Sequence, residues 1–78
     1  MTRTKGEEAA LEAFGQRVRE RRVALGWSLE EAGERCGLHW TYVGQVERHK
    51  RNLTLISVLK LARGLNLDAS DLLSGIRL

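Results

Sequence analysis

The apolar residues of this chain recur at helical spacing from residue 9 onward, and no segment alternates in the way a β-strand does. A first helix is indicated by apolar residues at intervals of three, four and seven positions, namely Leu11, Phe14, Val18 and Leu25. Gly26 offers a C-terminal stop for this helix. Residues 1–8 carry no apolar periodicity, so we expect a flexible N-terminal segment there and one domain over residues 9–78.

Two short helices joined by a glycine are predicted next. Ser28 and Glu31 have the spacing of a capping box, in which the hydroxyl and the carboxylate each satisfy a free backbone amide. The helix that they begin runs to Cys36 and stops at Gly37, and its inward positions are mostly small. Small residues suit close contact with a neighbouring helix, which we expect over residues 39–47.

The spacing around this corner fits a helix-turn-helix. Such a unit needs a small residue where its helices cross, which Gly33 supplies, and tolerance of positive φ four positions later, which Gly37 supplies. Buried apolar residues must then anchor the second helix, and Leu38, Val43 and Val46 have that spacing. An ordinary αα-hairpin with glycine at its corner fits the same pattern, so the spacing alone leaves both interpretations open.

The C-terminal part of the chain predicts two more helices. Thr54 can cap a fourth helix that ends near Gly64. The inward face of this helix is expected to contain Leu55, Val58, Leu59 and Ala62. Asp68 and Asp71 have a capping pattern at the start of a short fifth helix. The predicted fold class is therefore all-α, with five helices.

Length and composition exclude several classes of protein. A chain of 78 residues is one domain, and its thin core leaves no room for a deep substrate cavity. The single Cys36 excludes an internal disulfide framework and fits a reducing cytoplasm. The apolar stretches are too short to span a bilayer, and the charged first ten residues do not resemble a signal peptide. A net charge of +3 fits nucleic acid, a membrane surface or neither.

Metal binding and catalysis find little support in the sequence. The only ligand candidates besides carboxylates are Cys36, His39 and His49, and Cys36 is expected on the packed side of its helix. The serines near the C-terminus have no histidine at the spacing of a general base, and no glycine-rich loop follows a strand. We therefore expect no enzymatic activity, cofactor, metal ion or small-molecule ligand.

Residues 14–73 resemble the Cro/cI-type (XRE-family) helix-turn-helix domain. The stretches that match are residues 15–22, 26–31, 36–48, 51–55 and 61–65. Within that family, the chain is most similar to the controller proteins of restriction–modification systems over residues 41–43, 46–48 and 51–55. The resemblance implies a lambda-repressor-like fold and a homodimeric transcriptional regulator that binds a near-palindromic DNA operator.

The resemblance implies that the helix over residues 39–47 lies in the major groove of DNA, where each base pair presents a distinct pattern of donors and acceptors. The base-reading side chains would then be Trp40, Thr41, Gln45 and Arg48. The Gln45 amide can pair with adenine at two points, although a solvated amide fits the pattern as well. Trp40 departs from the arginine or glutamine that is frequent in the family, and its contact partner stays open.

Contacts to DNA phosphates are implied for Ser28, Tyr42, Lys50, Arg51 and Asn52. Leu29 departs from the family, which often has a phosphate-binding glutamine there, so backbone amides at the start of the second helix would take that part. An isolated basic run such as residues 48–52 is usually a solvated loop. Its position directly after the recognition helix favours a DNA contact instead.

A structural ion pair between Arg22 and Glu47 is also implied by the resemblance. A buried arginine needs a carboxylate in bidentate geometry, which this pair can supply. The alternatives are Arg19 as the partner of Glu47, or a solvated Glu47 with no partner.

Dimerisation is expected because one recognition helix reads only a few base pairs, so useful affinity needs two copies about one DNA turn apart. The C-terminal segment is more apolar than a small bundle can hide, and we expect it to form the two-fold interface. The residues assigned to this interface are Leu65, Leu67, Leu72, Leu73, Ile76 and Leu78.

A protein-interaction module is the competing hypothesis, either the antitoxin of a toxin–antitoxin pair or a small corepressor. Antitoxins usually add a partner-binding segment, and the few residues between the fifth helix and Leu78 leave little room for one. We therefore expect double-stranded DNA and a second copy of this chain as partners, in the bacterial cytoplasm and associated with the nucleoid, with no membrane partner.

Overall fold

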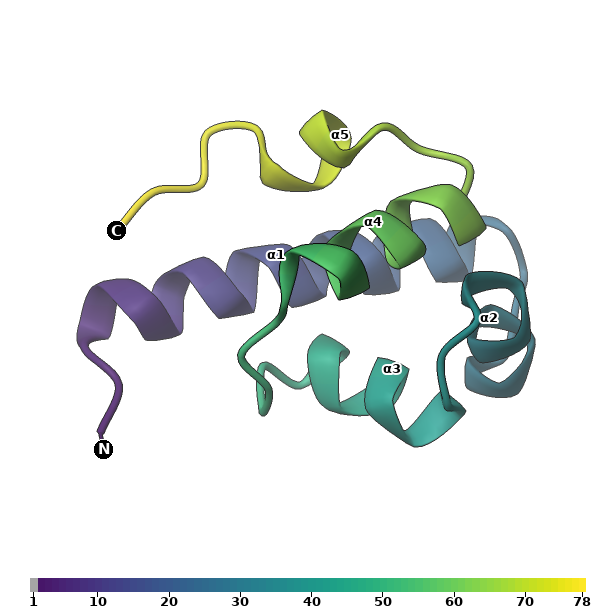
Figure 1. The fold of residues 1–78 in the computed structure, drawn as a ribbon, viewed down its shortest axis with the longest axis horizontal. Coiled ribbons are helices and arrows are strands. Elements are labelled where there is room, and N and C mark those ends of the chain that lie inside the picture. The colour runs from purple at the N-terminus through teal and green to yellow at the C-terminus, as the bar shows by residue number, and fades with distance from the viewer. Residues whose placement is uncertain (1) are drawn as a thin grey trace.

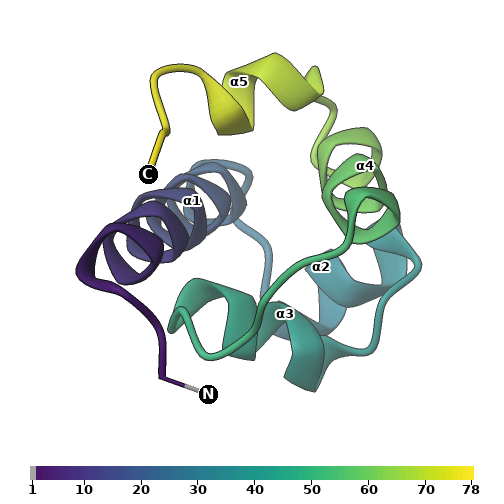
Figure 2. The same ribbon diagram turned by 60° about the vertical axis from the view of Figure 1, so that its left-hand side comes forward.

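Five helices make up residues 2–78, the part of the chain that this computed structural model describes, and no strand occurs in that range. They are α1 (Lys5–Ala24), α2 (Leu29–Cys36), α3 (Trp40–Glu47), α4 (Leu55–Gly64) and α5 (Ala69–Leu73). Figure 1 shows α1 running the length of the molecule, and Figure 2 shows the other four helices in an arc beside it. Contacts between neighbours run in the order α1, α3, α2, α4, α5 and back to α1. The all-α fold predicted from the sequence is confirmed, and no helix in residues 2–78 is long and apolar enough to cross a membrane.

The core fills the centre of this ring and draws on every helix. Its buried side chains are Phe14, Val18, Ala32, Cys36, Val43, Val46, Val58, Leu61, Ala62, Leu65 and Leu72. The three leucines are the largest of the completely buried side chains, and burial of one leucine contributes roughly 1.5–3 kcal/mol. The core therefore depends on α4 and α5 closing over α1 as much as on the corner between α2 and α3.

The first helix begins inside the segment predicted to be flexible. The Thr4 hydroxyl accepts a hydrogen bond from the Glu7 amide at 3.1 Å, and the Glu7 carboxylate accepts one from the Thr4 amide at 2.8 Å. This capping box starts α1 at Lys5, so the expectation for residues 1–8 is wrong from that point on. A capping box involves no apolar residue, which is why apolar periodicity did not reveal it. The first residue of the chain lies outside the described part.

The corner between α2 and α3 has the geometry that the glycine spacing predicts. Gly37 has a φ of 70° and ends α2 in the left-handed conformation. A Cβ atom at Gly33 would lie 2.6 Å from the carbonyl oxygen of Leu38 and 3.0 Å from the backbone of Trp40. Only glycine allows α2 and α3 to approach this closely, so the two helices form a helix-turn-helix.

The caps of α2 and α3 differ in detail from those expected. The Ser28 hydroxyl accepts from the Glu31 amide at 3.1 Å, but the Glu31 carboxylate accepts from Arg35 at 2.9 Å, so the reciprocal half of the capping box is absent from this helix start. His39 is the N-cap of α3 and not its first residue. Its Nδ1 accepts from the Thr41 amide at 3.1 Å, a role that requires this ring nitrogen to carry no proton.

The fourth helix turns a different face to the core from the one expected. Leu55 is 70% exposed and Leu59 is 45% exposed, so the prediction is wrong for these two residues. The buried residues of α4 are Val58, Leu61 and Ala62. Apolar residues occupy two faces of α4, and packing against α2 and α5 selects the face that continues into the core.

The C-terminal leucines are also distributed differently from the expectation. Leu65 and Leu72 are completely buried within one protomer, where they help to close the ring, so they cannot form an interface with a second copy. Leu67 and Ile76 pack partly buried against the same core. Of the six residues assigned to a dimer interface, only Leu73 and Leu78 are exposed, at 41% and 86%.

The close approach of α2 and α3 predicts whether one substitution, Gly33→Ala, raises or lowers the stability of the protein. Glycine to alanine inside a helix usually stabilises it by about 1 kcal/mol. Gly33→Ala is expected instead to lower the free energy of unfolding by about 1–3 kcal/mol, because its methyl group would force α2 and α3 apart. Urea unfolding followed by circular dichroism measures this change. Glu34→Ala, at the next and exposed position of α2, is the control and should change stability by less than about 0.5 kcal/mol. A gain in stability for Gly33→Ala would contradict the close packing.

Candidate nucleic-acid interface

The third helix is anchored from one side only. Val43 and Val46 are buried in the core, and a Cβ at the intervening Gly44 would touch Leu29 of α2 at 3.4 Å. The opposite face of α3 is open to solvent. The structure brings together on this face all four side chains predicted to read bases: Trp40, Thr41, Gln45 and Arg48. Trp40 is 43% exposed, and its ring stacks on that of His39 with 5.8 Å between ring centroids.

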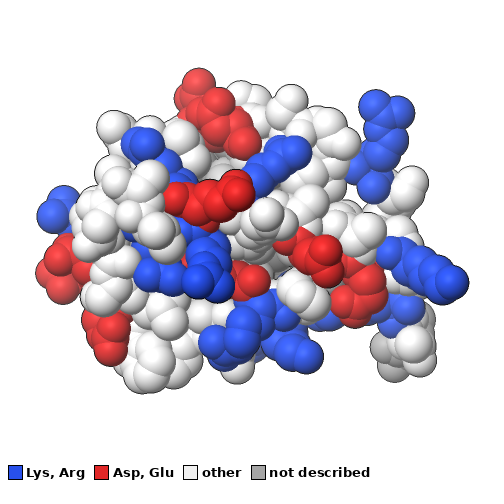
Figure 3. All heavy atoms as spheres, turned by 180° about the vertical axis from the view of Figure 1, so that it is seen from behind, with Lys and Arg blue, Asp and Glu red and all other residues white. Residues whose placement is uncertain are grey.

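The loop after α3 folds back beside the helix. The His49 amide donates to the Val46 carbonyl at 3.0 Å, and the Lys50 amide donates to the Gln45 carbonyl at 2.8 Å. These two bonds form a Schellman motif, with His49 in the left-handed conformation at a φ of 48°. As a result Lys50 and Arg51 are exposed next to the open face of α3. Figure 3 shows basic side chains spread among acidic ones over the back of the molecule, and several of them lie at its lower edge, the side on which Figure 1 places α3.

Three of the residues assigned to DNA form one cluster. Arg51 Nε donates to the side-chain oxygen of Gln45 at 2.8 Å, and the Arg51 guanidinium lies over the ring of Tyr42 at 5.3 Å from its centroid. A cation over an aromatic face is attracted by the ring quadrupole. Arg51 therefore connects Tyr42 and Gln45 of α3 to residues 48–52, which we call the basic loop.

The other predicted phosphate contacts lie at two places. The Ser28 hydroxyl lies at the start of α2, where its oxygen accepts the capping bond and its hydrogen remains available as a donor. Lys50 and Asn52 are exposed in the loop after α3. The Asn52 side-chain oxygen accepts from Arg3 Nε at 3.2 Å, a contact that sequence reasoning missed because it joins residues 49 positions apart.

The structure pairs Glu47 with Arg22 and not with Arg19. Arg22 Nε and Nη2 donate to the two carboxylate oxygens of Glu47 at 2.6 and 2.9 Å, and Nη1 donates to the Trp27 carbonyl at 2.8 Å. The two side chains are only 14% and 7% exposed. The hydrogen bonds to Glu47 raise the pKa of Arg22 above its usual value despite the opposing effect of burial, so the guanidinium stays protonated. It ties the end of α3 to α1.

The remaining reactive groups do not form a second site. The Cys36 thiol is buried, and it donates to the Leu61 carbonyl at 3.8 Å. Burial raises the pKa of this thiol, an effect that nearby Arg63 only partly opposes, so the thiol stays protonated at neutral pH. Within residues 2–78, no three His, Cys, Asp or Glu side chains are grouped so that they could hold a metal ion.

The fold and the exposed α3 define a helix-turn-helix protein, and comparison with known proteins agrees. The chain belongs to the helix-turn-helix family of DNA-binding transcription regulators, whose sequence pattern matches residues 18–72. It is 41% identical over 63 residues to the control protein C.SmaI of Serratia marcescens, a match that covers 81% of this chain and 75% of that protein. It is 38% identical over 61 residues to the control protein C.BamHI of Bacillus amyloliquefaciens, covering 77% and 75%.

A solved structure of a controller protein is also similar to this chain. The restriction-modification controller protein C.AhdI from Aeromonas hydrophila superposes with a TM-score of 0.79 at 47% identity, over 82% of this chain and 97% of that one. These comparisons confirm the resemblance to the XRE-type family and to its restriction–modification controllers. The family comprises transcription regulators and not enzymes.

The Arg22–Glu47 pair predicts that removing one partner lowers the stability of the protein much more than replacing both partners. Glu47→Ala is expected to lower the free energy of unfolding by about 3 kcal/mol, because it leaves the largely buried Arg22 without its counter-charge. The double substitution Arg22→Met with Glu47→Leu should recover most of this loss, since no unpaired charge remains. Urea unfolding measures both variants. Glu31→Ala, which breaks the exposed pair with Arg35, is the control and should leave the unfolding midpoint almost unchanged. Equal effects of Glu47→Ala and Glu31→Ala would contradict a structural role for the pair.

Proposed function

We propose that this protein controls the genes of a restriction–modification system by binding, as a homodimer, to a near-palindromic operator in the bacterial cytoplasm. The observation that carries this proposal is the open face of α3, which is anchored from behind by Val43 and Val46 and is followed directly by the exposed basic loop. The similarity to the control proteins C.SmaI and C.BamHI supports the narrower role.

In this proposal α3 enters the major groove and the cluster around Gln45 reads bases. Because Arg51 donates to the Gln45 oxygen, the groups left to face DNA are the Gln45 amide hydrogens and the other Arg51 donors. A surface made of donors matches guanine, which presents two acceptors in the major groove. Adenine presents one donor and one acceptor, so pairing with it requires the Gln45 oxygen to accept a second hydrogen or Arg51 to move.

The second subunit would cover an apolar face of α4. Leu55, Ile56 and Leu59, which we call the α4 patch, are 70%, 59% and 45% exposed. Three branched aliphatic residues on one helix face favour burial against another surface. A helix-turn-helix with a single reading helix needs a second copy to recognise a site of useful length, so we assign the patch to that copy. Leu73 of α5, which packs on α4, stays a candidate for the same interface.

Selection from a random duplex library tests the proposed operator. Repeated binding and amplification should enrich near-palindromes whose half-sites are about 10 base pairs apart, and titration should give two protein chains per duplex. Restriction and methyltransferase genes beside the enriched site in the source genome would support the controller role. Enrichment of a single asymmetric half-site would contradict the dimer, and a neighbouring toxin gene would favour an antitoxin.

Dimerisation through the α4 patch predicts the effect of a charge placed in it. Ile56→Lys is expected to weaken self-association by about 2 kcal/mol or more, roughly thirtyfold, because a lysine would be buried without a partner. Sedimentation equilibrium at tens of micromolar protein measures the change. Val23→Lys is the matched control, since Val23 is an equally exposed apolar residue on α1. A dimer that survives Ile56→Lys, or one that Val23→Lys disrupts equally, would place the interface elsewhere.

Base reading by Gln45 predicts a loss of selectivity. Gln45→Ala is expected to weaken binding to the selected operator by about 1–3 kcal/mol and to relax the preference at one base pair of each half-site. Fluorescence anisotropy with operators mutated one base pair at a time measures both effects. Lys50→Ala is the control: it should weaken all sequences alike and reduce the salt dependence of binding by roughly one ion per subunit. Equal weakening on all sequences by Gln45→Ala would show that Gln45 does not read a base.

A further inference from the structure

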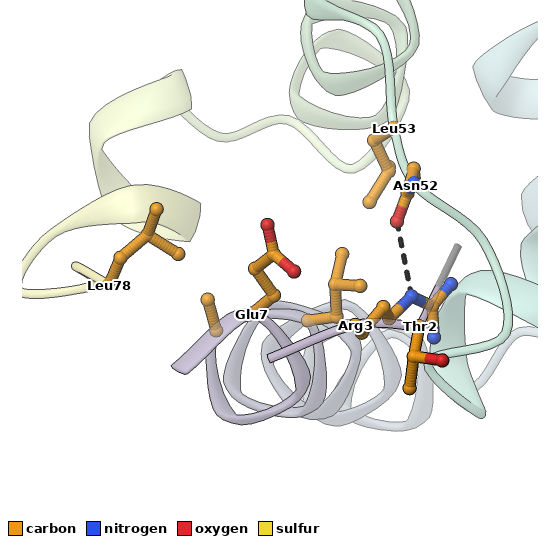
Figure 4. Close-up of a pocket in the computed structure, with 8 residues that line it drawn as sticks. Thr2, Arg3, Glu7, Asn52, Leu53 and Leu78 are labelled. Carbon is orange, nitrogen blue, oxygen red and sulfur yellow. Dashed lines mark hydrogen bonds between the residues drawn. The ribbon is translucent and has the colours of Figure 1, made fainter. Parts of the chain in front are cut away.

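The N-terminal end of the chain contacts the loop that follows α3. Arg3 Nη1 donates to the His49 carbonyl at 2.8 Å, and Arg3 Nε donates to the Asn52 side-chain oxygen at 3.2 Å. Nη1 also lies 3.4 Å from a carboxylate oxygen of Glu8, and the Arg3 side chain is only 24% exposed. Figure 4 shows Arg3 and Asn52 pointing toward one another across the space between α1 and this loop. A single guanidinium thus bridges both ends of residues 49–52.

The turn that Arg3 bridges is strained at its first residue. His49 has a φ of 48°, a conformation that costs a residue other than glycine roughly 1–2 kcal/mol. Contacts from Arg3 and from the N-terminal half of α1 surround His49. Arg3 binds the His49 carbonyl, while the carboxylates of Glu8 and Glu12 lie 3.7 and 3.9 Å from its ring nitrogens. The loop after α3 is therefore held in place by side chains from α1 and the residue just before its cap.

The same bridge fixes which way the Asn52 amide points. A guanidinium has only hydrogen-bond donors, so the atom of Asn52 that faces Arg3 must be the oxygen. The amide nitrogen, which carries two donors, is then left to face away from Arg3. A phosphate oxygen accepts hydrogen bonds and repels a carbonyl oxygen, so only this orientation suits a phosphate contact.

We propose that Arg3 is a positioning residue for DNA binding: by bridging His49 and Asn52 it holds residues 49–52 in the conformation in which the Asn52 amide donates to a DNA phosphate. The inference rests on the proposed function, because it assigns a role within that DNA-binding surface. Arg3 acts through Asn52 and makes no phosphate contact of its own in this account.

A double-mutant cycle on DNA affinity separates these roles. Arg3→Ala should weaken binding to the selected operator by about three- to tenfold, the value of one or two hydrogen bonds. Arg3→Lys keeps the charge but loses the two-point bridge, so it should be nearly as weak. In an Asn52→Ala background, Arg3→Ala should cause a clearly smaller loss than in the wild type, because only its bond to the His49 carbonyl remains to be lost. Arg19→Ala is the control, because it removes the same charge from an exposed position of α1. Losses that add in the double variant, or no loss from Arg3→Ala, would overturn the proposal.

A measurement without DNA keeps the result independent of the proposed function. The backbone ¹⁵N heteronuclear NOE of residues 49–52 should fall in Arg3→Ala while that of α2 and α4 stays unchanged, and Arg19→Ala should alter neither. An unchanged order of residues 49–52 in Arg3→Ala would overturn the positioning role whatever the DNA experiment gives. Failure of the wild-type protein to bind any duplex would refute the proposed function, and the NOE would still decide whether Arg3 orders the loop.

Discussion

The placement of α3 depends on the bidentate contact between Arg22 and Glu47. The Arg22 guanidinium links its own helix α1 to two other parts of the chain, because it also donates to the Trp27 carbonyl in the connection between α1 and α2. A domain of 78 residues has a thin core, and two buried valines cannot by themselves fix the angle at which α3 is presented. A directional contact at the end of the helix supplies that orientation. Replacing a buried ion pair by apolar groups is often neutral for stability. We therefore interpret the main role of this pair as fixing the orientation of α3 relative to α1.

The long first helix also supports both ends of the face that we propose binds DNA. Near its C-terminal end it carries Arg22, which holds the last residue of α3. At its N-terminal end Arg3, Glu8 and Glu12 surround the loop that begins at His49. Helix α3 and the loop of residues 48–52 are thus held from the same side by α1 and by Arg3 just before it. Figure 2 shows this arrangement, with α1 beside α3 and the chain's N-terminal end close to the loop after α3.

The sequence predicts the helix-turn-helix well because its signals are local. Gly33 and Gly37 indicate a close helix approach and a positive φ within a few residues, and the family resemblance around them distinguishes a helix-turn-helix from an ordinary αα-hairpin. The face of α4 could not be predicted in the same way, since apolar residues such as Leu55 and Leu61 lie on two stripes and only tertiary packing chooses between them. The contact of Arg3 with the loop was equally out of reach, because no periodicity connects residues so far apart in the chain.

The one-sided anchoring of α3 separates the residues that keep the protein folded from those that face its ligand. Val43 and Val46 are buried, whereas Trp40 and Thr41 are outside the core. An exchange on the open face therefore has little effect on stability, and a new side chain can be accepted there without compensating changes elsewhere. Trp40, which is 43% exposed and stacks on the neighbouring His39 ring, occupies such a position. A regulator built in this way can acquire a new operator in few mutational steps, and two copies of such a gene can diverge in target while both keep the same scaffold.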